Sequence, residues 1–295
     1  MAVTLAESAK LSQDMLQKGV IETMVESSAV LQVLPFMEVV GNAYTYNQVT
    51  TLPDVAFRDV NEGYTESASS FVQQTASLVM LGGDVDVDKF IVETRGNIND
   101  QRAIQTELKA KAVAQTFTSA FFYGDKASNS KSFDGLAKFV SGTQDFAVAD
   151  TTNGALTLAD LNKLVDAVPY GADAIFVSRS ARRIILNLLQ ASQHYLEIGQ
   201  DIFGKPVSLY AGIPLLVVED DILPAQGIDG ANGYDIFAVK FGAMSDVSGI
   251  QNGGVRVTDI GELETKPVYR TRIEWYCGLA VFNPKSVARL KGIKA

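Results

Sequence analysis

The sequence predicts an α+β protein, because helices and strands follow one another in mixed order along the chain. Three observations support this class. The stretch from Ala43 to about Met80 alternates polar and apolar residues with a period of two, as strands do. A helix of unusual length follows it, and the second half of the chain places short buried strands between capped helices.

The composition fits a protein with a large buried core and disfavours several functional classes. The chain has 295 residues, of which 47% are hydrophobic and 20% are charged. That is enough apolar material for one large core or for two sub-cores that share a sheet. The formal net charge of -9 disfavours a specific nucleic-acid reader, which needs a basic face. The single cysteine excludes an intramolecular disulfide framework.

The apolar stretches of the chain are short. The longest ones, Ile213 to Val218 and Leu279 to Phe282, have the length of strands and cannot span a bilayer. The first residues carry neither a basic region nor a long apolar region, so we expect no secretory signal. We therefore expect a protein that is made and used in a cytoplasm, with no membrane partner.

The N-terminal segment up to about Leu34 predicts one amphipathic helix, which Pro35 ends. Its apolar residues lie among alternating charges and fall on one helical stripe, made of Leu16, Val20, Met24 and Leu31. A single amphipathic helix at a terminus must pack against something, either its own domain or a neighbouring subunit.

The period-two stretch predicts a long β-hairpin. Asn61, Glu62 and Gly63 form a favourable turn between its two arms. Residues that share a face of one arm are Tyr44 with Tyr46, Val55 with Phe57, and Val72 with Ala76, Leu78 and Met80. A hairpin this long and with few charges is poorly stable alone and needs a surface to lie on. This feature points towards assembly.

A strand from Val85 to Val92 and then a long helix are predicted next. The helix opens at about residue 98 and runs to about Tyr123, where Gly124 is placed to end it. Its apolar side is formed by Ile104, Leu108, Val113, Phe117 and Phe121. At roughly 25 residues this helix would be about 37 Å long, which is long for a compact enzyme core.

The middle of the chain predicts capped helices between buried strands. Thr157 caps one helix, with Asp160 three positions further on. Ser178 caps another helix directly after a buried strand at 174–177. Further strands are predicted at 213–218 and 235–239.

Near the end of the chain, the stretch from Pro267 to Phe282 alternates again, which predicts a strand. One face of this strand would carry Arg270, Arg272, Glu274 and Tyr276. The other face would carry Tyr269, Ile273, Trp275 and Cys277.

The order of these parts resembles that of the major capsid proteins of tailed phages, whose Johnson fold is shared with encapsulins. In that family an N-terminal arm, an extended hairpin, a strand, a spine helix, a central domain and a return strand follow one another. Local phrases are similar as well. They are Phe133-Asp134-Gly135-Leu136, Leu209-Tyr210-Ala211-Gly212-Ile213-Pro214, and the end from Arg272 to Val281 and from Pro284 to Leu290. The resemblance covers nearly the whole chain, and the order of the phrases carries it.

The resemblance implies both an architecture and a function. The implied parts are an N-arm at 1–35, a first P-domain part at 36–145 with the E-loop (about 43–80) and the spine helix (about 98–123), an A-domain at 146–260, and P-domain return strands at 261–295. The implied function is structural and not enzymatic, with no cofactor and no metal. Copies of the chain would assemble as pentamers and hexamers into the icosahedral shell that encloses the genome of a tailed phage. The implied location is the virion capsid, assembled in the host cytoplasm.

The resemblance also implies how the subunits touch and what else they meet. Each subunit would lend its hairpin to a neighbour, so we expect intersubunit contacts at Phe57, Arg58, Tyr64, Val72 and Leu78. Residues 42–88 contain no lysine, so we expect no covalent cross-link of the kind that some members form through a lysine in the hairpin. The other expected partners are a separate scaffolding protein, a portal, and packaged double-stranded DNA held by weak non-specific contact.

Two other functions stay open. An encapsulin-like nanocompartment has the same fold but loads a cargo enzyme instead of DNA. A soluble enzyme of an unrelated α+β family would need a convergent polar pocket. The only histidine, His194, follows a helix, and no nucleophile elbow is present elsewhere, so a plain surface or interface histidine is the favoured interpretation. Cys277 has no nearby base in the sequence, which favours a buried structural thiol.

Three carboxylates, those of Asp84, Asp86 and Asp88, would share one face of a strand. A solvated strand face is the favoured interpretation. Three carboxylates could also hold Ca²⁺ if a neighbouring subunit added oxygen ligands.

A small basic cluster, made of Arg179, Arg182 and Arg183, lies at the start of a predicted helix. It could meet phosphate or a neighbour's carboxylates, although a solvated helix start is the favoured interpretation. The two glycine pairs at 82–83 and 253–254 predict flexible turns or hinges.

Overall fold

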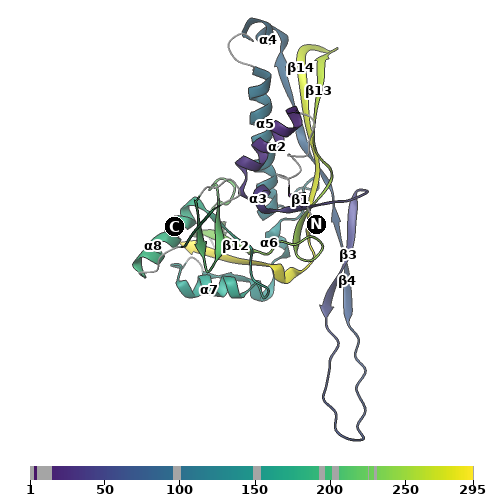
Figure 1. The fold of residues 1–295 in the computed structure, drawn as a ribbon, viewed down its shortest axis with the longest axis vertical. Helices are drawn as coiled ribbons and strands as arrows, with labels where there is room; N and C mark the ends of the chain where they lie inside the picture. The colour runs from purple at the N-terminus through teal and green to yellow at the C-terminus, as the bar shows by residue number, and fades with distance from the viewer. Residues whose placement is uncertain are drawn as a thin grey trace.

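We describe the protein from a computed structural model, which covers residues 3–4, 15–95, 101–148, 154–192, 197–200, 206–224, 226–228 and 231–294. The molecule is elongated (Figure 1). A broad part built on one sheet lies beside a tall part built on a second sheet, and a two-stranded arm projects from the junction of the two parts. The mixed order of helices and strands confirms the predicted α+β class.

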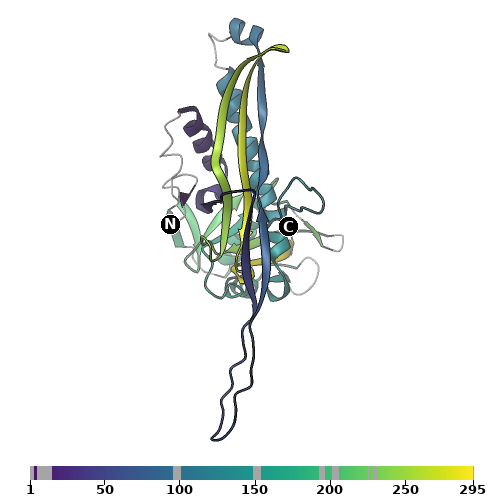
Figure 2. The same ribbon diagram turned by 90° about the vertical axis from the view of Figure 1, so that its right-hand side faces the viewer.

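The tall part is a five-stranded sheet with the strand order β1, β2, β13, β14 and β5. Their bounds are β1 Val3–Thr4, β2 Pro35–Glu38, β5 Val79–Asp88, β13 Val247–Leu263 and β14 Lys266–Val281. β13 and β14 form one long antiparallel hairpin, and β5 pairs antiparallel along the outer side of β14. Figure 2 shows these three long strands side by side.

Among the described residues, four helices belong to the tall part. They are α2 Met15–Ser27, α3 Ala29–Val33, α4 Lys89–Arg95 and α5 Gln101–Tyr123. The long helix α5 has 23 residues and packs against α2 as well as against β5 and β14. It ends at Tyr123 as predicted. A side chain at Gly124 would collide with the carbonyl oxygens of Ala120 and Phe133, so glycine permits the close approach of these segments.

Two local predictions for this part are wrong. The N-terminal segment is not one helix, because Ser28 has an extended backbone and separates α2 from α3. The hydroxyl of Ser28 caps α3 by accepting from the Leu31 N–H, and it also bonds to the Thr118 hydroxyl at 2.7 Å. The strand predicted up to Val92 ends at Asp88, whose carboxylate accepts from the Phe90 N–H at 2.8 Å and so begins helix α4.

The buried face of α5 differs from the predicted one at the start of the helix. Val113, Phe117 and Phe121 are buried as predicted, but Ile104 and Leu108 are exposed. Thr106 and Ala110 are buried instead. The face that meets the sheet is therefore rotated by part of a turn from the most apolar stripe of the sequence.

The broad part is an eight-stranded sheet with the order β6, β15, β12, β7, β10, β9 and β8, to which β11 is added beside β12. The bounds are β6 Asp145–Ala147, β7 Ala174–Ser178, β8 Glu197–Gln200, β9 Pro206–Tyr210, β10 Ile213–Val218, β11 Gln226–Ile228, β12 Ala231–Val239 and β15 Val287–Lys294. β7, β10 and β12 lie at the strand positions that the sequence predicts.

Helices cover both faces of this second sheet. One face packs on α7 Leu158–Asp166 and α8 Arg179–Ala191, and the other packs on the end of α5 and on α6 Leu136–Phe139. The two predicted caps are confirmed. Thr157 and Asp160 form a capping box at the start of α7, and the Ser178 hydroxyl accepts from the Ala181 N–H at the start of α8.

The sheets divide the chain differently from the domain limits implied by the resemblance. β13 begins at Val247, before the expected limit at residue 260, and belongs to the five-stranded sheet. β15, within the expected return strands at 261–295, belongs to the eight-stranded sheet. The division into N-arm, P-domain and A-domain therefore stays a prediction, and we describe the molecule by its sheets.

One continuous core joins the two sheets and is rich in aromatic rings. Phe117 packs between Phe36 and Trp275 of the tall part, with ring centroids 6.0 and 4.7 Å away. Phe122, on the same helix, contacts Phe176 and Phe237 of the broad part. The helix α5 thus packs against both sheets and joins them into one body.

Candidate assembly interface

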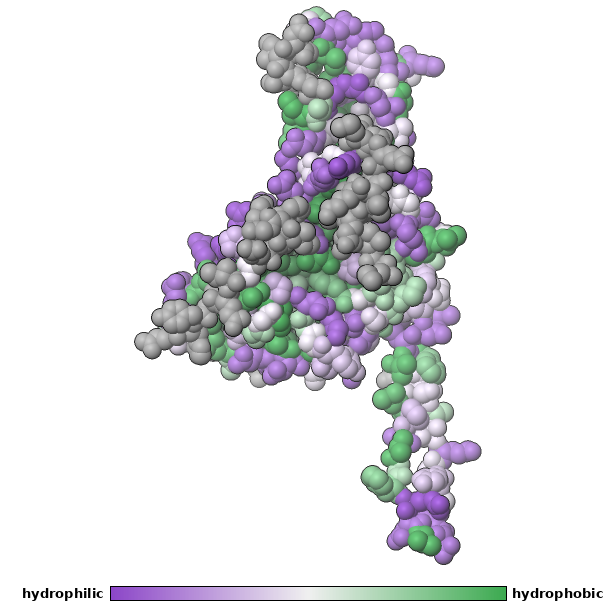
Figure 3. Space-filling model, in the orientation of Figure 1, coloured by the Kyte–Doolittle hydropathy of each residue, from purple (hydrophilic) through white to green (hydrophobic). Residues whose placement is uncertain are grey.

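The projecting arm is the most exposed apolar feature of the molecule. It consists of β3 Ala43–Thr51 and β4 Ser70–Ser77, which pair only with each other, and of the extended segment 52–69 between them. The arm carries large apolar side chains that are about half or more exposed: Val49, Leu52, Val55, Phe57, Val60, Tyr64, Phe71 and Val72. Figure 3 shows hydrophobic side chains along its length.

The tip of the arm is a turn held by its own polar contacts. Asn61 has a φ of 70°, the left-handed conformation that asparagine tolerates in turns. The carboxylate of Glu62 accepts from the Asp59 N–H at 3.2 Å, and Arg58 donates to the Glu62 carbonyl oxygen at 2.9 Å. The Arg58 guanidinium also lies 5.1 Å from the centre of the Tyr64 ring. The turn predicted at residues 61–63 is therefore present at this tip.

The five predicted contact residues fall into two groups. Phe57, Arg58, Tyr64 and Val72 all lie on the arm, and Phe57 is fully exposed. Leu78 lies at the root of the arm and is half-buried in its own subunit, beside a small cluster of Met37, Val39, Ala76, Ile250 and Ala280. Four of the five residues therefore lie on the projecting arm, with Val72 on β4 and the other three near the tip, and Leu78 lies at the root.

A second exposed apolar surface lies at the far end of the tall part, around the start of α4 and α5. It is formed by Phe90, Ile91, Ile104, Leu108 and Ile260. Two ion pairs border it, one from Lys89 to Glu262 at 3.0 Å and one from Arg102 to Asp259 at 2.6 Å. The sequence analysis missed this surface. From the sequence, Ile104 and Leu108 on α5 could not be distinguished from the buried residues of that helix, because both sets are apolar and recur at helical spacing.

The outer face of β5 carries the predicted row of aspartates, and arginines of β14 neutralise two of them. Asp84 lies opposite Arg272, with 2.7 Å between Oδ1 and Nε, and Asp86 lies opposite Arg270 at 2.6 Å. These hydrogen bonds lower the pKa of both carboxyls from its ordinary value. Asp88 instead caps α4.

This arrangement leaves the aspartate row as a set of ion pairs and a helix cap. Within the described ranges, no group of histidine, cysteine, aspartate and glutamate residues is placed to hold a metal ion. The predicted hinge at Gly82-Gly83 is also wrong, because both glycines lie inside β5. A side chain at Gly82 would collide with the carbonyl oxygen of Ile273 on β14, so glycine is needed there for close strand packing.

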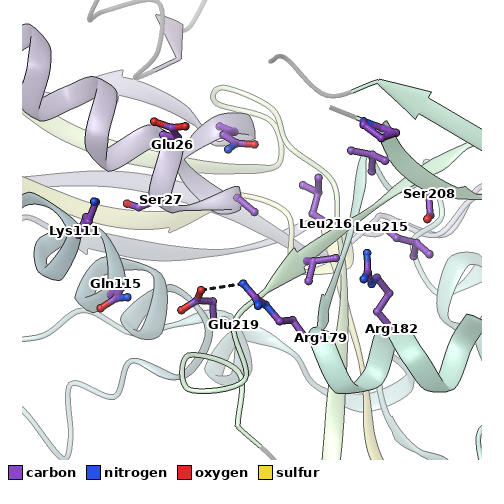
Figure 4. A pocket seen from close by; sticks show the side chains of 15 residues that line it. Glu26, Ser27, Lys111, Gln115, Arg179, Arg182, Ser208, Leu215, Leu216 and Glu219 are labelled. Carbon is purple, nitrogen blue, oxygen red and sulfur yellow. Dashed lines mark hydrogen bonds and ion pairs between the residues drawn. The ribbon is translucent and has the colours of Figure 1, made fainter. Parts of the chain in front are cut away.

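A cleft of about 490 Å³ lies between α3, α5, α8 and the strands β9 and β10 (Figure 4). Its apolar lining includes Leu215 and Leu216, and its charged lining includes Lys111, Arg182 and the ion pair of Arg179 with Glu219 at 3.1 Å. The cleft therefore offers opposite charges around apolar side chains, without a convergent set of catalytic groups.

The arginine cluster at the start of α8 is largely balanced by its own subunit. Arg179 pairs with Glu219, and Arg183 donates to the Ser180 hydroxyl at 3.1 Å. Asp220 accepts from both the N–H and the hydroxyl of Ser180. Burial alone would raise the pKa of Asp220, but these hydrogen bonds outweigh it and lower the pKa. A solvated helix start with carboxylate neighbours fits this arrangement.

A buried charged network lies where α5 meets the second sheet. The Asp235 carboxylate is fully buried and accepts from the Tyr123 hydroxyl at 2.7 Å and from Arg289 at 2.6 Å. Burial raises the pKa of Tyr123, and the neighbouring Asp235 raises it further. The network ties the long helix to β12 and β15, and its Tyr123 also lines an open cleft of about 730 Å³ together with Ala120 and Asp125.

The two residues weighed as nucleophile or base have different outcomes. Cys277 is fully buried, and burial raises the pKa of its thiol, which confirms the structural interpretation. His194 lies outside the described residues. Among the helices that are described, we find none with the length and hydropathy of a membrane span.

Comparisons with known proteins support one fold. The family model for the major capsid protein GP7 matches residues 12–153, which is just under half of the chain and includes the arm and α5. No curated protein matches the sequence.

Three solved structures are similar over most of their length. The holo-SrpI encapsulin complex from Synechococcus elongatus PCC 7942 has a TM-score of 0.70 at 20% identity, covering 90% of this chain and 87% of that one. The capsid of a native GTA particle has a TM-score of 0.66 at 14% identity, covering 91% of both chains. A protein of Mycobacterium phage Adephagia has a TM-score of 0.62 at 12% identity, covering 99% and 98%.

These matches agree with the resemblance seen in the sequence. The match to the phage protein covers 99% of the chain and so includes both sheets, the arm and the long helix, which are the parts whose order carried that resemblance. The chain is therefore a Johnson-fold protein, with the fold that tailed-phage major capsid proteins share with encapsulins.

Proposed function

We propose that the chain is a structural subunit that assembles with copies of itself into a closed shell. The observation that carries this proposal is the arm, whose large apolar side chains are exposed in the single chain. A two-stranded ribbon has no second layer to cover its own faces. An exposed apolar surface of this kind is typical of a site that another protein covers.

The energetics of such a contact suit assembly. Burying a side chain such as Phe57 contributes about 1.5–3 kcal/mol, part of which is lost in ordering the arm and the partner. Each contact can therefore be weak, while a shell that closes many contacts at once becomes stable. Weak single contacts also allow a misplaced subunit to leave before the shell closes.

More specifically, the proposed shell is the icosahedral capsid of a tailed phage, built from pentamers and hexamers. The match to the GP7 major capsid protein family over residues 12–153 supports this version. The further partners would be a separate scaffolding protein, a portal and packaged double-stranded DNA. The net charge of -9 is compatible with DNA that is enclosed by weak non-specific contact and not gripped. The location would be the virion, with assembly in the host cytoplasm.

An encapsulin-like compartment is the second candidate. The observation in its favour is the similarity to the encapsulin of Synechococcus elongatus, with a TM-score of 0.70 over 90% of the chain. The neighbouring genes separate the two candidates: a terminase or portal gene supports the phage capsid, and a peroxidase or ferritin-like gene supports the compartment. In both cases the proposed role is structural, with no catalytic residues and no cofactor.

Negative-stain microscopy of the purified chain, combined with light scattering on the same sample, tests the proposal. We expect closed shells, tubes, or rings of five and six subunits. A monomer or dimer that stays small at high concentration, both alone and with the candidate scaffolding protein, would contradict shell formation.

A further inference from the structure

The direction of the arm must be set at its root. β3 and β4 form a two-stranded sheet of their own, and β4 is joined through Leu78 to β5 of the body without sharing its sheet. The backbone bond from the Leu78 N–H to the Asn42 carbonyl oxygen, 2.8 Å, closes the ribbon where it leaves the body. This bond joins the two ends of the arm to each other, and it does not fix the angle of the arm.

One face of β3 supplies the contacts that can fix this angle. The alternating residues Tyr44, Tyr46 and Gln48 are half-buried, while the residues between them are exposed. The Tyr46 hydroxyl donates to the carbonyl oxygen of Val281 at 2.9 Å, and the Gln48 amide donates to the same oxygen at 2.8 Å. A carbonyl oxygen has two lone pairs, so both donors can be accommodated at once.

An aromatic cluster surrounds these two hydrogen bonds. The Phe282 ring lies 4.7 Å from the Tyr46 ring and 6.0 Å from the Tyr44 ring, centre to centre. The Tyr46 hydroxyl is a protonated donor at neutral pH, as any tyrosine is, and burial raises its pKa further. The side chains of Tyr44, Tyr46 and Gln48 therefore all contact the body at Val281 and Phe282.

The receiving segment is held firmly by the body. Val281 is fully buried at the end of β14 and pairs with Val247 of β13. The next residue, Phe282, donates its N–H to the Asp246 carbonyl oxygen at 2.9 Å. The acceptor is thus a backbone atom at the paired end of a strand, and it cannot move away by a change of rotamer.

The length of the arm makes its root angle important. The stretch from Gln48 to the tip at Asn61 would reach ~43 Å at ~3.3 Å per residue, so a tilt of ~10° at the root moves the tip by ~7 Å. Such a displacement is larger than the distance over which apolar side chains touch, ~4.5 Å. A small loss of precision at the root would therefore misplace Phe57 and Tyr64.

We infer that Tyr46 and Gln48 are positioning residues, which aim the arm through their shared bond to the Val281 carbonyl so that its tip reaches a second copy of the chain. This inference rests on the proposed function, because it assigns how the exposed arm is presented for assembly. The opposite face of the ribbon is bonded to the body through a flexible lysine side chain, because Lys126 Nζ donates to the Ser77 hydroxyl over a longer distance of 3.4 Å. There, the Thr45 and Thr75 hydroxyls lie 3.4 Å from each other and are exposed.

The test measures the position of the arm directly. The full chain receives spin labels at Thr65→Cys near the tip and at Asp166→Cys on α7, and the distance between them is measured in dilute, unassembled protein. Both positions are exposed, while the native Cys277 is fully buried and stays unlabelled. The variant Tyr46→Phe with Gln48→Leu removes both donors and keeps the volumes of the side chains. The matched control is Thr45→Val with Thr75→Val, on the other face of the same strands.

We expect the double variant to keep its melting temperature, to broaden the distance distribution at least twofold, and to slow the initial rate of assembly at least tenfold. The control should change none of these. Gln48→Leu alone should broaden the distribution by a smaller amount. A distribution as narrow as that of the wild type in the double variant would overturn the inference, whatever happens to assembly. The results distinguish the two proposals. A wild-type chain that forms no shells would contradict the shell function, while the distance measurement would still test whether Tyr46 and Gln48 position the arm.

Discussion

The second sheet and the arm contain similar apolar residues in opposite environments. Phe176 on β7 is fully buried, packed edge-on against Phe121 and Phe122 of the long helix. Phe57 on the arm is fully exposed. The difference follows from the number of layers, because helices cover both faces of the second sheet, while residues 52–68 of the arm extend beyond the body and are exposed.

This contrast shows which residues stabilise the fold of one chain and which are available for contact with a second subunit. An aromatic ring in the core contributes to the folding of one chain. On the arm the same ring contributes nothing to the fold and becomes useful only when a second subunit covers it. Variants in the two regions should therefore change different measured quantities.

The largest effect is expected from Phe176→Ala. Removing a fully buried aromatic ring leaves a cavity and should lower the free energy of unfolding by about 3–5 kcal/mol. Urea unfolding measures this change. The matched control is Phe57→Ala, which should change the free energy of unfolding by less than about 0.5 kcal/mol. Equal losses in the two variants would show that the arm packs against its own subunit in solution.

A somewhat smaller effect is expected from Asp235→Asn. This variant removes the negative charge that faces Arg289 at 2.6 Å and leaves the guanidinium largely buried without a counter-charge. Loss of one partner of a buried pair costs about 3–5 kcal/mol, and we expect about 2–4 kcal/mol here, because the side chain of Arg289 keeps some contact with water.

The control for this prediction removes both charges. Asp235→Asn combined with Arg289→Leu should recover part of the lost stability in the same urea experiment, because no unpaired buried charge remains. Losses that simply add in the combined variant would mean that the two side chains do not stabilise each other.

The smallest energetic effect, and the one that isolates the arm, is expected from Phe57→Ser with Tyr64→Ser. The free energy of unfolding should change by less than about 0.5 kcal/mol. The association of subunits should weaken at least tenfold, which corresponds to about 1.4 kcal/mol per contact. Light scattering during assembly measures this, with Thr65→Ala, an exposed polar position on the same arm, as control. Normal assembly of the serine variant would remove these two residues from the proposed contact.

Local signals explain most of what the sequence predicted correctly. The capping box of Thr157 and Asp160 and the stop of α5 before Gly124 depend on a few neighbouring residues. The alternation along β14, with Ile273, Trp275 and Cys277 buried, follows from the period of a strand with one face in a core. The projecting arm was predictable because a long, weakly charged hairpin has no partner in its own sequence neighbourhood.

The sequence analysis failed where distant segments decide the local structure. β13 was not predicted, although it has 17 residues, because Gly253 and Gly254 suggested a hinge. In the structure these two glycines have positive φ angles and form a bulge at which the register between β13 and β14 shifts. The pairing with β14 keeps the strand continuous through the bulge.

The sequence by itself therefore determined the class of the fold, the long helix, the helix caps and an arm that needs a partner, because each depends on periodicity or on residues close in the chain. Only the tertiary structure decided that Asp84 and Asp86 face arginines of β14, that Ile104 and Leu108 are exposed, and that Leu78 stays with its own subunit. It also decided that Tyr46 and Gln48 share the carbonyl of Val281. These features join residues far apart in the chain, and their geometry exists only once both sheets have packed on α5.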